Sequence, residues 1–197
     1  MNKHRGFSIV ELMIGLAIGA IVLGSTGALY VSTLRASLEG VKQQRFDQSV
    51  LTLMNLIATE IRRAGFSNSV TSLPDVPGWN AGSHFYTNGT CALFTYVDTT
   101  LPISKQQFFG YKLDTISGVM YFYRSDEKVD CSESTAWEAM TDPAQIKLSQ
   151  PVGGSLFSNP SNPKLIEIHL IAEATGLKTG SDSVSREVTM KVFIRNN

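Results

Sequence analysis

Residues 5–31 read RGFSIVELMIGLAIGAIVLGSTGALYV, a short polar leader followed by an apolar run that contains one acid, Glu11. From Leu12 to Val31 the run has 20 residues. At about 1.5 Å per residue, a helix of that length crosses a hydrocarbon core of about 30 Å. A carboxylate inside a membrane segment costs roughly 2.5–3.5 kcal/mol on insertion scales. A plain anchor gives no reason for that cost, so Glu11 indicates a specific partner.

The residues before the apolar run predict its orientation. A cationic leader at residues 3–5 precedes the run and no comparable basic cluster follows it, which favours a cytoplasmic N-terminus. An ordinary secretory signal has an apolar core of about 7–15 residues and an A-x-A-like cleavage site. This run is longer and has no clear site of that kind. A plain single-pass anchor explains everything except Glu11 and the Gly6–Phe7 junction.

The sequence GFSIVE at residues 6–11, followed by an apolar helix, resembles the N-terminal signal of type IV pilins and type II secretion pseudopilins. The resemblance implies that a prepilin peptidase cleaves between Gly6 and Phe7, removing a leader of residues 1–6, and that the new Phe7 amine is methylated. It also implies that the Glu11 carboxylate pairs in a filament with the Phe7 amine of a neighbouring subunit. Two unpaired charges are costly in low dielectric, so this pairing would select the axial register of the subunit.

The helical pattern continues beyond the membrane-length run. Between residues 46 and 64 apolar side chains recur at steps of three or four, which predicts one buried face of a helix. These residues are Phe46, Val50, Leu53, Met54, Ile57, Ile61 and Ala64. Gly65 is predicted to cap the C-terminus, after two arginines whose charge suits that end. We expect one helix over residues 7–65, with a membrane and assembly half at 7–31 and an amphipathic half at 41–65.

Five glycines lie within this helix, and each costs roughly 1 kcal/mol relative to alanine in water. They are Gly15, Gly19, Gly24, Gly27 and Gly40. Close approach of helices in lipid is one interpretation. Local melting or bending during assembly, which the resemblance suggests, is the other. No proline precedes Pro74, so a break would lie at residues 24–27 or at Gly40.

The sequence pattern of residues 66–197 is typical of a β-rich domain. Residues 67–89 are rich in Ser, Asn, Pro and Gly and predict an irregular connection. Strands are expected at residues 92–97, 108–113, 119–124, 165–172 and 187–194, with a short one at 145–148 inside a loop at 143–163. Residues 114–118 fit a five-residue hairpin connection. Period-two alternation predicts an antiparallel sheet packed on the amphipathic helix, and therefore an α+β, pilin-like fold.

The two cysteines, Cys91 and Cys131, are expected outside the cytoplasm, where disulfides persist. A bond between them would close a loop of about 40 residues, worth roughly 3–4 kcal/mol in the chain-entropy account. Two unpaired core thiols are the alternative.

Features of the second half narrow the resemblance. The segment EIRRAGF at residues 60–66, the strand that begins at Cys91, and Cys131 followed by Trp137 are similar to PilW-type minor pilins. The terminal strand ending at residues 194–196 adds to this similarity. Such proteins are structural subunits that help to prime type IV pilus assembly and enter the fibre. J-type minor pseudopilins of type II secretion share the long helix and the β-rich build, and are the nearest alternative.

The resemblance also implies partners and a location. The partners would be other minor and major pilins, the prepilin peptidase, the inner-membrane assembly platform and inner-membrane lipid. Before assembly the chain would span the bacterial inner membrane once, with its β domain in the periplasm. Afterwards it would lie in the pilus fibre or at its tip. A membrane-anchored periplasmic binding or sensor domain that keeps residues 1–6 is the less favoured reading.

No feature of the sequence favours an enzyme. G-x-S-x-G, P-loop, H-E-x-x-H and C-x-x-C motifs are absent, so we expect no catalytic residues, no cofactor and no metal. The 17 basic and 17 acidic residues become 15 and 17 when Lys3 and Arg5 leave with the leader, a formal charge of −2. A surface of that charge does not favour nucleic acid.

Several isolated residues allow a structural or a functional interpretation. His84 and His169 are expected to be surface residues, and the acids at 126, 127 and 130 a solvated loop rather than a calcium site. Asn88-Gly89-Thr90 matches a glycosylation sequon, although Asn-Gly favours a turn. Four aromatic residues either pack over the sheet or helix or mark an interface. They are Trp79, Phe85, Tyr86 and Trp137.

Overall fold

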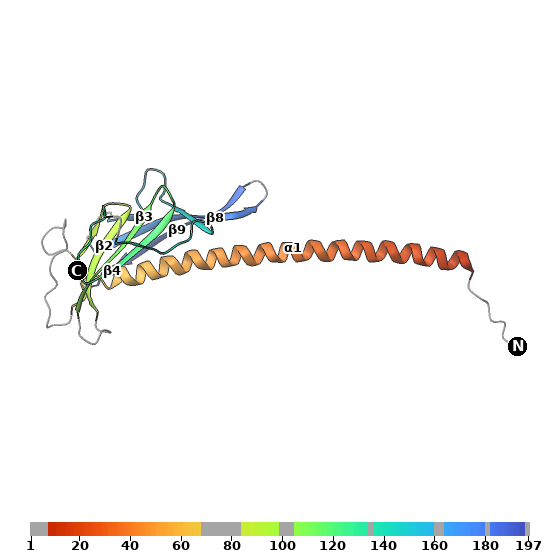
Figure 1. Ribbon diagram of the computed structural model, residues 1–197, viewed down its shortest axis with the longest axis horizontal. Coiled ribbons are helices and arrows are strands. Elements are labelled where there is room, and N and C mark those ends of the chain that lie inside the picture. The colour runs from red at the N-terminus through yellow and green to blue at the C-terminus, as the bar shows by residue number, and fades with distance from the viewer. Residues whose placement is uncertain are drawn as a thin grey trace. The chain divides into compact units, whose positions relative to one another are not determined.

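The computed structural model describes residues 8–67, 84–98, 105–133, 136–159, 164–179 and 182–195. Within these residues one long helix, α1 (Ile9–Arg62), is followed by nine strands whose pairings are all antiparallel (Figure 1). The chain forms two compact units, residues 1–44 and residues 45–197. The α+β class predicted from the sequence is therefore confirmed.

One face of α1 between residues 45 and 62 lies in the core of the β domain. The face predicted from the three-and-four spacing is buried, with Ala58 as an addition. Its buried residues are Phe46, Val50, Leu53, Met54, Ile57, Ala58 and Ile61, followed by Ala64. They form one apolar cluster with side chains of both sheets. Each Å² of apolar area removed from water contributes about 25 cal/mol, so burial of this face contributes to the stability of the unit.

The end of α1 is fastened to the sheet. Gly65 adopts a φ of 75°, a left-handed conformation that favours glycine, as its predicted capping role requires. The Gly65 amide donates to the Thr95 carbonyl at 2.9 Å, and the Val97 amide donates to the Phe66 carbonyl at 2.8 Å. Residues 63–65 form a turn rather than the last helical residues that the sequence predicted.

The first sheet has five strands in sequential order. They are β1 (Phe85–Thr87), β2 (Cys91–Asp98), β3 (Lys105–Asp114), β4 (Val119–Ser125) and β5 (Glu138–Ala139). Its helix-facing side is aromatic because alternate residues of paired strands share a face. Phe94 lies opposite Phe109, and Tyr111 lies opposite Phe122. The Tyr96 and Phe109 rings stack with centroids 4.1 Å apart.

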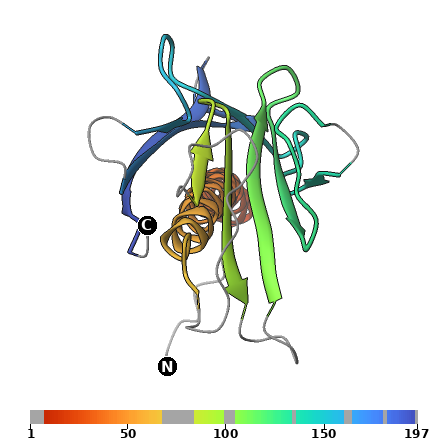
Figure 2. The same cartoon turned by 90° about the vertical axis from the view of Figure 1, so that its left-hand side faces the viewer.

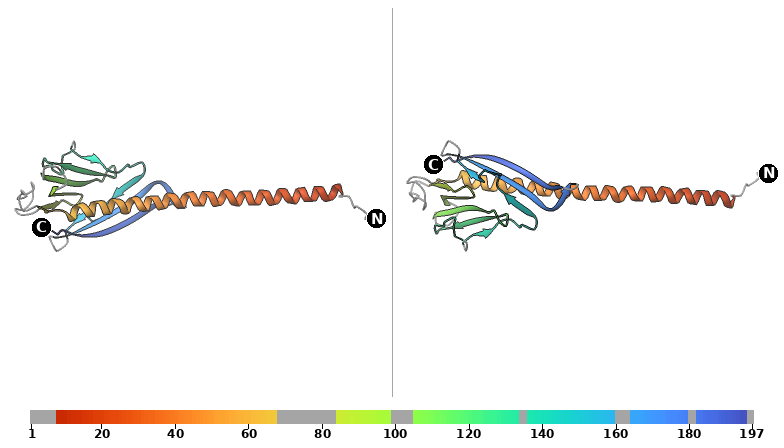
Figure 3. Two further views of the ribbon diagram at one scale, coloured as in Figure 1. Left: turned by 90° about the horizontal axis from the view of Figure 1, so that it is seen from below. Right: turned by 90° about the horizontal axis from the view of Figure 1, so that it is seen from above.

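The second sheet consists of four strands built around β8 (Leu165–Thr179). The short strands β6 (Ile146–Ser149) and β7 (Phe157–Ser158) pair with β8, and β9 (Asp182–Phe193) also pairs with it. Figure 2 looks along α1 and shows the strands of the 45–197 unit curving around one side of its helical segment. The two views of Figure 3 show β8 and β9 running alongside that segment.

Three strands and the sheet count differ from the sequence prediction. β1 lies in the predicted irregular connection, β7 lies in the predicted loop, and β5 was not predicted. Each has only two or three residues, too few for a period of two to appear. One sheet was expected and two are found, because antiparallel alternation does not reveal which strands are neighbours. β9 also begins at Asp182 and β8 continues to Thr179, so this hairpin is longer than expected.

The hairpin predicted around residues 114–118 is confirmed, but its connection is one residue shorter because Asp114 is the last residue of β3 and pairs with Val119. Gly118 has a φ of 72°, and its amide donates to the Asp114 carbonyl at 2.8 Å. The Asp114 carboxylate accepts hydrogen bonds from the Ser117 hydroxyl at 2.6 Å and from the Ile116 amide at 3.0 Å. The Ser117 bond first, and then the Ile116 bond, lower the pKa of Asp114.

Candidate functional site

The N-terminus of α1 is capped by a reciprocal pair of hydrogen bonds. The Ser8 amide donates to Glu11 Oε2 at 3.0 Å, and Ser8 Oγ accepts from the Val10 amide at 3.3 Å. This is a capping box, in which Ser and Glu three residues apart satisfy donors left open by the first helical turn. A side-chain cap of this kind contributes about 1 kcal/mol to helix stability. Glu11 therefore has a local structural role in a single subunit, which the sequence prediction missed although S-x-x-E is its known signature.

The predicted processing site itself lies just before the described residues. Gly6 and Phe7 are outside the part of the chain that the structure describes, so cleavage between them and methylation of Phe7 stay predictions. Pairing of Glu11 with a second subunit also stays a prediction, because a single chain cannot test it. In the sequence Glu11 follows Phe7, the residue that would carry the new amine, by four positions.

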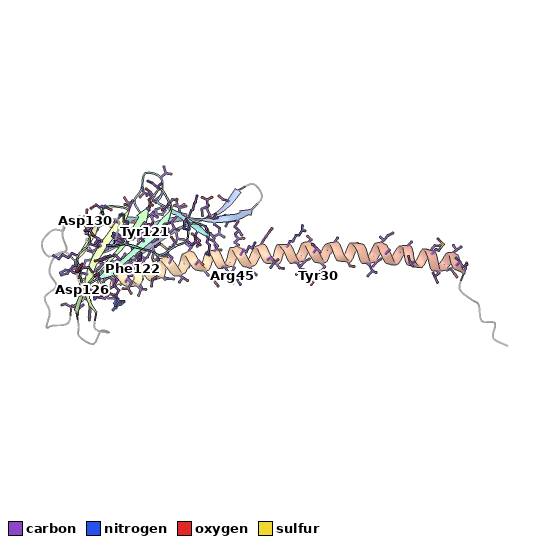
Figure 4. All side chains as sticks on the ribbon, in the orientation of Figure 1. Tyr30, Arg45, Tyr121, Phe122, Asp126 and Asp130 are labelled. Carbon is purple, nitrogen blue, oxygen red and sulfur yellow. A yellow bond between two sulfur atoms is a disulfide. The ribbon has the colours of Figure 1, made fainter. Side chains whose placement is uncertain are left out.

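The first half of α1 is apolar and exposed on all sides. Its large side chains from Ile9 to Leu38 are 45–79% exposed, and Figure 4 shows Tyr30 projecting outward from the helix. By length and composition α1 contains a stretch able to cross a membrane. A stable protein rarely leaves this much apolar surface in water, so lipid or other helices must cover it.

Polar side chains within the apolar half are satisfied by the helix itself. The Ser25 and Thr26 hydroxyls both donate to the Val22 carbonyl at 2.9 Å, and the Thr33 hydroxyl donates to the Leu29 carbonyl at 2.9 Å. Such back-bonding removes the need for outside partners in lipid. α1 is continuous through residues 24–27 and Gly40, and a break there during assembly stays a prediction.

Cys91 and Cys131 form the predicted disulfide, with Cα atoms 6.0 Å apart. The bond holds the segment after β4 against the face of the first sheet that is turned away from α1. Trp137 packs in the same small core, directly over Gly110. A Cβ at Gly110 would lie 2.6 Å from Trp137 Cη2, so only glycine admits the indole there.

The other singled-out residues make local contacts. The Asp130 carboxylate accepts from the Ser132 amide at 3.0 Å in the loop that Figure 4 marks with Asp126 and Asp130. Asn88 Oδ1 accepts from the Cys91 amide at 3.0 Å and so supports a turn. His169 contacts Glu187 at 2.5 Å. Among the described residues no three His, Cys, Asp or Glu side chains are grouped to hold a metal.

The predicted aromatic markers pack within the domain where the structure describes them. Phe85 and Trp137 are buried, and Tyr86 packs on the core around the disulfide. Trp79 lies outside the described residues.

A pocket of about 450 Å³ lies between the last turns of α1 and the aromatic side of the first sheet. The Tyr96 hydroxyl donates to Glu60 Oε2 at 2.6 Å, and the Arg63 guanidinium lies 4.3 Å above the Tyr96 ring. Burial, and then the nearby Glu60 carboxylate, raise the pKa of Tyr111, which keeps this phenol protonated. The sequence did not predict this group, since its members come from five separate segments.

Two protein-family models match the chain. Residues 39–194 match the family described as prepilin peptidase-dependent protein B, and residues 1–27 match the prokaryotic N-terminal methylation motif. The two matches do not overlap, and residues 28–38 lie between them. No curated protein and no solved structure matches the chain.

Proposed function

The chain belongs to the prepilin peptidase-dependent protein B family, and from this membership we propose that it is a minor pilin that helps to prime type IV pilus assembly and is incorporated into the fibre. The methylation motif and the family match make it a pilin-like protein processed by prepilin peptidase. The observation that carries the finer proposal is α1 itself, which joins an exposed apolar half to a half buried in the β domain.

In the proposed mechanism α1 exchanges one apolar environment for another. Lipid covers its first half in the inner membrane, and helices of other subunits cover it in the fibre. Because both environments are apolar, moving between them leaves little net hydrophobic driving force, and packing and polar pairing decide the outcome. The β domain lies in the periplasm, where the Cys91–Cys131 bond is stable.

Glu11 has two successive roles in this mechanism. Before assembly it caps its own helix through the Ser8 amide. In the fibre its carboxylate pairs with the methylated Phe7 amine of a neighbouring subunit. A charged group in low dielectric is costly without a partner, so subunits that align these two charges are favoured over those that do not. The role is structural, and we propose no catalysis.

Fibre content tests this proposal directly. Fibres sheared from cells are expected to contain the chain at a small fraction of the major subunit, and deletion of its gene should strongly reduce the number of fibres. Intact-protein mass should place the mature N-terminus at methylated Phe7. A chain that keeps residues 1–6 and never appears in fibres would instead be a membrane-anchored periplasmic binding or sensor domain. Loss of protein secretion with normal fibres would mark a pseudopilin.

A further inference from the structure

The strand β9 has one edge that no strand of the described residues pairs with. Within the described residues it pairs with β8 and with no other strand. The Ile194 amide donates to the Lys164 carbonyl at 2.8 Å, so even-numbered residues of this strand direct their backbone groups toward β8. By alternation the odd-numbered residues direct their N–H and C=O groups toward the open edge. They are Ser185, Glu187, Thr189, Lys191 and Phe193.

An apolar strip adjoins this edge. Figures 1 and 3 show β9 running beside the segment of α1 at residues 45–62 and in the same direction as that segment, and Arg186 Nε donates to Asp47 Oδ1 at 2.8 Å. Leu51 follows Asp47 by about 6 Å along the helix, and Val188 follows Arg186 by about 6.6 Å along the strand. Leu51 is 51% exposed, and Val188 is only partly buried. The side chains of an added strand would therefore have apolar surface to cover.

The charges on the outer face of β9 specify what an added strand should carry. Glu187 and Lys191 lie on either side of Thr189, and all three side chains are exposed. An antiparallel neighbour centred on Thr189 places one of its residues opposite each charge. A basic residue opposite Glu187, which also contacts His169, and an acidic residue opposite Lys191 would form cross-strand ion pairs.

We propose that the open edge of β9 binds an extended segment of another pilin-like subunit as an added antiparallel strand. The recognised segment reads acidic, apolar, polar, apolar and basic in chain order. Its backbone bonds to the odd-numbered residues of β9, and its apolar side chains cover Leu51 and Val188. That the partner is another pilin-like subunit rests on the proposed function. Natural edge strands are usually short or blocked, whereas β9 has 12 residues.

A second copy is not the partner in a fibre. β9 itself carries the matching pattern at residues 187–191, EVTMK. However, two copies joined through antiparallel β9 strands would have their α1 segments at residues 45–62 running in opposite directions. Subunits of one fibre enter it from one membrane and point the same way, so a different chain must supply the segment.

The same pattern supplies a defined probe. A fluorescent peptide with the sequence SVSREVTMKVF, copied from residues 183–193, is titrated against the full chain in detergent and its anisotropy is measured. The control peptide SVSRKVTMEVF has the same composition with the acid and base exchanged. We expect the first peptide to bind about tenfold more tightly, because two attractive pairs replace two repulsive ones.

Protein variants separate backbone pairing from side-chain contact. Thr189→Pro removes an N–H that faces the open edge and should abolish peptide binding, whereas Thr189→Val should bind like the wild type. The double variant Glu187→Lys, Lys191→Glu should prefer the control peptide.

Equal binding of the two peptides, or unchanged binding by Thr189→Pro, would overturn the proposal. If Thr189→Pro does not fold by circular dichroism, the double variant decides alone. These binding measurements need no fibre. The minor-pilin assignment is tested separately, because it fails if the chain is absent from fibres.

Discussion

Individual residues carry roles that their neighbours along the chain do not reveal. Gly110 sits in the middle of β3, where glycine normally weakens a strand. Its place is explained by Trp137, which packs on it from a segment that follows β4. Glu11 is the opposite case, since its capping role follows from a local S-x-x-E pattern and could have been predicted. Contacts between distant segments, such as Glu60 with Tyr96, could not.

Substitution at Gly110 should be destabilising. Gly110→Ala places a methyl group 2.6 Å from the Trp137 ring and 2.8 Å from the Leu93 side chain. Overpacking of this kind costs typically 1–3 kcal/mol. Urea unfolding of the full chain in detergent should show that loss, and the double variant with Trp137→Ala should lose less than the sum of the two single changes. Additive losses would show that the two residues do not share the contact.

Asp114 should make stability depend on acid pH. Its pKa is lowered in the folded chain by hydrogen bonds from Ser117 and Ile116, so its contribution is fully present above the unfolded pKa near 4. That contribution is lost as the pH falls through the folded pKa. Asp114→Ala should therefore lower the Tm at pH 7 and have a smaller effect at pH 2. The same Tm difference at both pH values would contradict this role.

A helix or strand could be predicted from the sequence where it was long enough for its hydrophobic period to repeat. The amphipathic half of α1 repeats over several turns, and its buried face was predicted except for Ala58. β2, β3 and β4 were found close to their true bounds for the same reason. β1, β5 and β7 were missed because two or three residues carry no period. The arrangement into two sheets depends on pairing between distant strands, which no local pattern encodes.

The buried face of α1 should dominate the stability of the β domain. Ile57 is fully buried, whereas Leu56 beside it is 45% exposed. Ile57→Ala should cost about 2–5 kcal/mol, because it removes a transfer term and leaves a cavity. Leu56→Ala, the matched control, should cost less than about 1 kcal/mol. Similar losses in chemical denaturation would mean that this helix face is not packed as described.

At the scale of the whole molecule, the chain combines two surfaces with different requirements. The first half of α1 exposes apolar side chains that need lipid or neighbouring helices. The unit at residues 45–197 has its own core and a disulfide, and it needs neither. The proposed function requires this combination, because the helix of a subunit that enters a fibre would leave the membrane while its domain stays folded.

We propose that the charge of Glu11, and not only its capping of α1, drives entry into the fibre. Glu11→Gln separates the two roles, because glutamine also accepts the Ser8 amide in a capping box but carries no charge to pair with an amine. Glu39→Gln, at an exposed position farther along the same helix, is the matched control.

The decisive measurement is the ratio of fibre-incorporated to membrane-retained chain for each variant, with processing checked by intact mass. We expect Glu11→Gln to be processed normally yet to be largely absent from fibres, and Glu39→Gln to enter them as the wild type does. Incorporation of Glu11→Gln at the wild-type ratio would contradict it.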